Sequence, residues 1–143
     1  MTSIRISPDI GIVIVAAPAY FKKAARPNVP GDLVHHECIN MRFSMRGGLY
    51  AWELKKGKRS LEVRVSGAWT FNSIYAVIDA TLAGFGLAYM PLELAKDHIA
   101  SGRLQTVLED WCPTFPGLHL FYPSHRQTSS ALSVVVDALR YKV

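Results

Sequence analysis

Apolar residues recur along the chain at two spacings, one typical of strands and one typical of helices. Continuous or alternating apolar runs predict strands over 4–6, 10–17, 38–43, 50–54, 61–65, 87–90, 104–108 and 118–122. Apolar residues three and four positions apart predict helices over 74–82 and 129–141, and prolines predict shorter helices starting at Pro18 and Pro91. Strands therefore alternate with helices, which indicates an α/β sandwich.

The clearest predicted helix has signals at both ends. Asn72 or Ser73 can cap its start, and Gly84 stands where a C-terminal stop is expected. Gly84-Phe85-Gly86 also resembles a fragment of a phosphate-binding fingerprint, but it follows a helix and precedes a strand, which is the reverse of the usual order. We interpret these glycines as a helix stop.

Composition narrows the class of protein. The 143 residues are 50% hydrophobic and 19% charged, which suits one globular domain with two small lobes as the upper limit. The two cysteines form no CxxC pair, so neither a disulfide scaffold nor a structural zinc site is supported, and a reducing, cytoplasmic setting is the simpler expectation. The apolar run that ends before Lys22 is shorter than the roughly 20 residues of a membrane helix. A secretory signal is the weaker interpretation of that run, because its β-branched residues are typical of a buried strand.

Positive charge is concentrated in the first half of the chain. Residues 1–66 hold 11 Lys plus Arg against 5 Asp plus Glu, whereas residues 67–143 hold 5 and 6. The densest run, Lys55, Lys56, Lys58 and Arg59 around Gly57, lies between two alternating apolar segments and predicts the tip of a hairpin. We interpret this tip as a solvated turn; a nucleic-acid contact is disfavoured because one loop forms no basic stripe.

Signatures of catalysis are absent from the sequence. It has no GxSxG, HExxH or paired-carboxylate pattern. His35, His36 and Cys38 are neighbours without a second ligand pair, so a metal site is disfavoured. We therefore expect no catalytic residue, no metal and no cofactor.

Several residues suit binding instead. The amides near Asn72, at a helix start, could hold a carboxylate, and Phe71 beside them could pack on a ring. Arg42 and Phe43 end a strand and could reach the same crevice at the carboxyl edge of the sheet. The alternative is an ordinary cap, two packed aromatic residues and a surface arginine. If these residues bind, the arginine and the amides favour an anion such as an aromatic or short organic acid.

Short segments in a fixed order resemble one known family. The matching segments are Ile4–Asp9, Ala16–Phe21, Pro27–Leu33, His36–Arg42, Trp52-Glu53, Phe71-Asn72, Gly84–Pro91, Gly102–Leu104, Val107–Pro113, Phe115–Gly117 and Tyr122–Arg126. Together they cover nearly the whole chain, and the Val-Leu-Glu-Asp-Trp-Cys-Pro segment is among the most specific. The sequence is similar to the effector-binding domain of LysR-type transcriptional regulators.

This resemblance implies a periplasmic-binding-protein-like α/β fold in which two lobes enclose a small effector. It implies crossover strands over 1–16, a near-complete effector-binding lobe over 17–110, and, over 111–143, the returning strand and C-terminal helix of an incomplete second lobe. The winged helix-turn-helix of the family would precede this sequence, so we expect DNA contact only through a domain absent here. Truncation would leave the apolar face of the helix over 129–141 without its usual partners, and we expect a homo-oligomer or a rearranged helix.

Matching the crevice-facing loops of the family's second lobe implies an effector site. Its residues would be Arg42, Phe43, Phe71, Asn72 and Met90. The implied function is that of a cytoplasmic sensor of a small, anionic organic effector in a LysR-type regulator, with no enzymatic activity and no membrane partner. The alternative is a periplasmic-type solute-binding protein of related fold.

Overall fold

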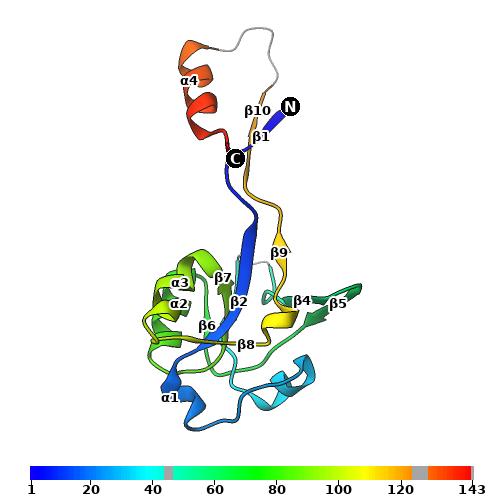
Figure 1. The fold of residues 1–143 in the computed structure, drawn as a ribbon, viewed down its shortest axis with the longest axis vertical. Helices are drawn as coiled ribbons and strands as arrows, with labels where there is room; N and C mark the ends of the chain where they lie inside the picture. Colours follow the sequence, from blue (N-terminus) through cyan, green and yellow to red (C-terminus); the bar gives the residue numbers. More distant parts are fainter. Residues whose placement is uncertain (44–46, 124–128, 143) are drawn as a thin grey trace. The chain divides into compact units, whose positions relative to one another are not determined.

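The computed structural model describes residues 1–43, 47–123 and 129–142, and the chain divides into two compact units (Figure 1). Unit 1 combines Met1–Ile10 with Thr114–Val143, and unit 2 is the continuous segment Gly11–Pro113. Unit 1 therefore gathers both ends of the chain. Ser124, His125 and Arg126, part of one matching segment, lie outside the described residues.

Strand β2 (Ile10–Ala16) is the centre of the main sheet of unit 2. It pairs antiparallel with β7 (Ala88–Pro91) on one side and with β8 (Gln105–Val107) on the other. Its β-branched run is buried from Ile14 to Ala16, as the sequence predicts for an interior strand. Helices α2 (Ile74–Leu82) and α3 (Leu92–Ala100) pack against β7 (Figure 1).

The ends of these two helices differ in detail from the prediction. Gly84 follows α2 with φ +87° and donates its N–H to the Thr81 carbonyl, so the predicted helix stop is confirmed. Ser73 occupies the N-cap position of α2, but its side chain makes no capping hydrogen bond. Pro91 still belongs to β7, with extended φ and ψ of −58° and 135°, and α3 therefore begins one residue later than predicted.

The remaining elements of unit 2 are short. They are α1 (Pro18–Phe21), the 3-10 turns η1 (Pro30–His35) and η2 (Glu109–Trp111), the parallel pair β3 (Asn40–Met41) and β6 (Thr70–Phe71), and the hairpin of β4 (Trp52–Lys56) and β5 (Arg59–Val63). The strand predicted over 38–43 is reduced to β3. Its flanks pair with other partners, because Cys38 bridges Leu87 and Arg42 bridges Leu49.

The predicted hairpin is present, with Gly57 at its tip at φ +62°. Lys56 and Arg59 stand opposite each other, a repulsive arrangement for two cations. Both cations lie over the ring of Trp111, at 5.8 Å and 5.7 Å from its centre. The negative face of the indole therefore offsets part of their repulsion.

Two buried apolar clusters form the core of unit 2. One extends from Ile14 through Trp52 and Leu54 to Leu108, and the other contains Val15, Ile39, Val77, Met90 and Leu104, among further residues. Successive residues of β2 enter different clusters, because neighbouring side chains on a strand point to opposite faces. The two faces of the central sheet are thus both covered.

Unit 1 is a smaller assembly of strand pair and helix. Strand β1 (Thr2–Arg5) pairs antiparallel with β10 (His119–Tyr122), and the unit also contains β9 (Thr114–Phe115) and α4 (Ser130–Leu139). The Ser129 hydroxyl caps α4 by accepting from the Leu132 amide at 3.1 Å. None of the described helices is long and apolar enough to cross a membrane.

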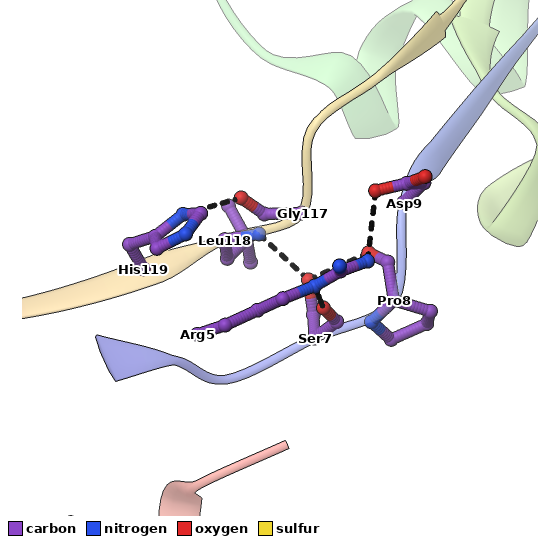
Figure 2. A network of polar contacts seen from close by, with 7 residues as sticks. All are labelled: Arg5, Ser7, Pro8, Asp9, Gly117, Leu118 and His119. Atoms are coloured by element: carbon purple, nitrogen blue, oxygen red, sulfur yellow. Dashed lines mark hydrogen bonds and ion pairs between the residues drawn. The ribbon is translucent and has the colours of Figure 1, made fainter. Parts of the chain in front are cut away.

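A hydrogen bond between Leu118 and Ser7 joins the two segments of unit 1, and further polar contacts order the first segment (Figure 2). The Leu118 amide donates to the Ser7 hydroxyl at 2.7 Å, and that hydroxyl donates to the Pro8 carbonyl at 2.9 Å. Arg5 adds a bond to the Ser7 carbonyl and an ion pair with Asp9, both at 2.8 Å. A Cβ on Gly117 would clash with the Ser7 and Pro8 carbonyls, so only glycine allows this approach of the two backbones.

Candidate functional site

A cavity of about 280 Å³ opens within unit 2 beside the second core cluster. We call it the aromatic pocket. Its lining residues come from β2, β3, β4, α2, β7, α3 and adjoining loops: Ile12, Ile39, Met41, Phe43, Tyr50, Trp52, Ile74, Val77, Tyr89, Met90, Pro91 and Leu94. None of these twelve side chains is charged at neutral pH.

Four aromatic rings form one continuous wall of the pocket. Phe43 meets Tyr50 edge to face, with ring centres 5.1 Å apart and planes at 88°. Tyr50 lies 5.9 Å from Tyr89, which stacks on Trp52 at 5.7 Å and 21°. Such pairs stabilise one another beyond their buried area. The wall is therefore preorganised for an apolar or aromatic ligand.

The two phenol groups of the pocket share one partner. The Tyr50 hydroxyl donates to the Glu53 carboxylate at 3.0 Å, and the Tyr89 hydroxyl donates to the Glu53 backbone carbonyl at 3.0 Å. Burial, followed by the hydrogen bond to Glu53, raises the pKa of Tyr50 to about 12. Burial is also the main cause that raises the pKa of Tyr89 above its usual range. Both phenols therefore stay neutral at physiological pH.

Two of the five residues predicted for the effector site line this pocket. Met90 is fully buried in its wall, and Phe43 is 67% exposed, which places its ring at the solvent edge. Arg42, Phe71 and Asn72 are not among the lining residues. Arg42 lies between Met41 and Phe43, which both line the pocket, and alternation along an extended segment turns it away from them.

Phe71 and Asn72 have other surroundings. The Phe71 ring packs against the second core cluster and lies parallel to Trp69, with centres 6.1 Å apart. Its carbonyl accepts the Arg42 amide at 2.8 Å, so backbone pairing joins these two positions. Asn72 is exposed just before the start of α2. A role in effector binding stays a prediction for all five residues.

Sequence reasoning missed most of the pocket wall. The sequence pattern predicts one strand that contains Tyr50 and Trp52 and a buried strand that contains Tyr89, and neither prediction assigns these residues to a binding site. An aromatic residue in a strand has the same pattern whether it fills a core or borders a cavity. The spacing of Tyr50 and Trp52 on one strand face is the one available signal, and it does not show that Tyr89 lies beside them.

The chain matches the family described as LysR substrate binding domain over residues 7–143. It therefore belongs to that family, whose members are the effector-sensing domains of LysR-type transcriptional regulators. The predicted family, fold class and sensing function are confirmed, and the solute-binding alternative is not favoured.

Among curated proteins, the chain is 51% identical over 141 residues to a putative transcriptional regulator of Pseudomonas aeruginosa, covering 99% of this chain and 46% of that protein. It is 39% identical over 142 residues to the HTH-type transcriptional regulator PgrR of Escherichia coli, covering 99% and 48%. The chain thus spans about half the length of these relatives.

Solved structures show the same fold at low sequence identity. The regulatory domain of an AphB variant from Vibrio vulnificus superposes with a TM-score of 0.84 at 22% identity, covering 96% of this chain and 68% of that one. The regulatory domain of CrgA from Neisseria meningitidis superposes with a TM-score of 0.76 at 24% identity, covering 96% and 67%. These similarities support the periplasmic-binding-protein-like architecture.

Proposed function

We propose that this chain senses a small organic effector through the aromatic pocket and passes the signal to a transcription regulator of which it is part. The observation that carries this proposal is the position of the pocket, which lies entirely within the segment matched by the family. Its apolar lining is typical of small-molecule sites. Binding, and not catalysis, is the activity this lining supports.

Contact with DNA belongs, in this proposal, to another part of the regulator. The relatives named as transcriptional regulators are about twice as long as this chain. A regulator of this kind acts in the cytoplasm, where its DNA lies. We also propose that 17–110 is the effector-binding lobe, that 1–16 are crossover strands, and that 111–143 complete the other lobe; unit 2 contains the whole of 17–110.

The anionic character of the effector stays a prediction from the sequence. It rests on Arg42 and on the amides near Asn72 at the start of α2. Ile74, the first residue of α2, does line the pocket, whereas Arg42 does not. An acidic group would therefore have to bind at the start of α2 rather than against the arginine.

Self-association through unit 1 is the proposed oligomeric contact. Phe121 on β10 is 66% exposed, and Val134 and Val135 on α4 are 68% and 49% exposed. Apolar side chains exposed on a strand pair and a helix favour burial against a second copy. Sedimentation of the 143-residue chain should show a dimer that Phe121→Asp converts to monomer; a monomeric parent would contradict the proposal.

Ligand-dependent stabilisation tests the sensing function. A library of small aromatic and aliphatic compounds would be screened for increases in the Tm of this chain, since a ligand at about 100 times its Kd stabilises the folded state by about 2.7 kcal/mol. Hits should stabilise Phe43→Ala less than they stabilise the parent chain. A chimera in which this chain replaces the matching half of PgrR should then respond to the same hits in a reporter assay. Hits that stabilise Phe43→Ala equally would contradict the assignment of the pocket.

A further inference from the structure

The ligand class follows from the polar atoms of the aromatic pocket. We infer that the pocket selects an uncharged, flat, apolar group of about two fused rings over a carboxylate of the same shape. This inference rests on the proposed function, because it concerns the same site. The cavity of about 280 Å³ is nearly twice the ~150 Å³ of an apolar protein cavity that binds benzene, so a two-ring group matches its size.

Hydrogen-bond donors inside the pocket are already used. The hydroxyls of Tyr50 and Tyr89 both donate hydrogen bonds to Glu53. Among the twelve lining side chains, the indole N–H of Trp52 is the one further hydrogen-bond donor, and it carries no charge. A carboxylate needs several donors when it leaves water. The side chains of the twelve described lining residues do not supply them.

The acidic groups nearest the Tyr50 hydroxyl also oppose an anion. The carboxylate of Glu53 bonds the Tyr50 hydroxyl, and Glu62 stands directly opposite Glu53 in the hairpin. Two acidic groups therefore lie on the strands behind the aromatic wall, whereas Arg42 is absent from the lining. An uncharged ring avoids both the desolvation cost and this repulsion.

The rings themselves favour a flat partner. Phe43 and Tyr50 are perpendicular, so a ligand ring can stack on one and meet the edge of the other. Phe43 is 67% exposed, which leaves much of its ring available at the entrance. Below it, Met90 and Val77 are fully buried and close the apolar floor.

Calorimetric titration of the 143-residue chain with two probes that share the indole ring tests the inference. The probes are indole, which is neutral, and indole-3-carboxylate, which is anionic at neutral pH. We expect the Kd of indole to be about tenfold lower or more, because each tenfold step needs only about 1.4 kcal/mol and an unpaired buried charge costs more. Phe43→Ala should raise the Kd of indole about three- to tenfold through loss of one ring contact. Tyr75→Ala is the matched control, because Tyr75 on α2 is 69% exposed but is not among the lining residues of the pocket.

The outcomes separate the inference from the proposed function. Tighter binding of the carboxylate that still weakens in Phe43→Ala would overturn the neutral ligand class and leave the pocket as the sensing site, with the acid placed at the start of α2. Binding that Phe43→Ala and Tyr75→Ala affect equally, or no binding of either probe, would overturn the assignment of the pocket itself.

Discussion

Different interactions stabilise the interior of each of the two units. Unit 2 buries two apolar clusters in which Ile14, Leu87 and Met90 have no exposed surface. In the described part of unit 1, Ile4 and Val136 are the buried hydrophobic side chains, and a strand ladder and polar contacts supply the rest. Unit 2 therefore depends mainly on the packing of apolar side chains, whereas unit 1 depends mainly on hydrogen bonds and close contacts between backbone segments.

The largest expected effect is the loss of packing in unit 2. Leu87→Ala should lower the free energy of unfolding by about 2–5 kcal/mol, because Leu87 has no exposed surface and its truncation leaves a cavity in the core. Urea denaturation followed by circular dichroism measures this change. Leu118→Ala in unit 1, where the side chain is 58% exposed, is the control and should change stability by about 0.5 kcal/mol or less. Equal losses in the two variants would break the contrast between the units.

An intermediate effect is expected from backbone crowding in unit 1. Gly117→Ala places a methyl group against the Ser7 and Pro8 carbonyls and should cost about 1–3 kcal/mol. Amide hydrogen exchange should accelerate in β1 and β10 while the amides of β2 keep their protection. Gly31→Ala is the control, because nothing lies within 4 Å of its added Cβ. Faster exchange throughout unit 2 would show that the units do not unfold separately.

The smallest effect concerns pH in unit 2. The Tyr20 hydroxyl lies 2.6 Å from His36 Nδ1 and accepts the Glu37 amide at 3.2 Å, so the tyrosine proton is directed to a neutral imidazole. Burial lowers the pKa of His36, and Asp32 opposes this shift in part. The unfolded chain therefore binds the proton more readily, and the stabilisation present above pH ~6.5 is lost as the pH falls below it.

His36→Gln removes this titration, so its loss of stability between pH 7 and pH 5 should be smaller than that of the parent chain. Unfolding free energies measured at several pH values give the two slopes. Parallel curves would exclude His36 as a source of the pH dependence.

Periodicity predicted most elements of unit 2 because its signals are local. The apolar run of β2, the spacing of α2 and the Gly84 stop each depend on neighbouring residues, and each is present in the structure. The strand over 38–43 was predicted too long. Its pairing partners, Leu87, Thr70 and Leu49, come from three different parts of the sequence, and no local pattern specifies that.

The candidate site was predictable only in part. Phe43 and Met90 were found by matching the loops of a known family, and both line the pocket. The same matching gave Arg42, which is not among the lining residues, because a shift of one position along an extended backbone reverses the direction of a side chain. Tyr50 and Tyr89 were missed because their 39-residue separation conceals a contact between rings 5.9 Å apart.

By itself, the sequence determined the family, the alternation of strands and helices, the helix stop at Gly84 and the charged hairpin tip, because each follows from residues close together in the chain. Tertiary structure alone decided which aromatic side chains form one wall and that Glu53 accepts hydrogen bonds from both phenols. It also decided that position 117, beside Ser7, has no space for a Cβ atom. These features arise from contacts between distant segments, whose geometry is fixed only when the backbone hydrogen bonds and the apolar clusters form together.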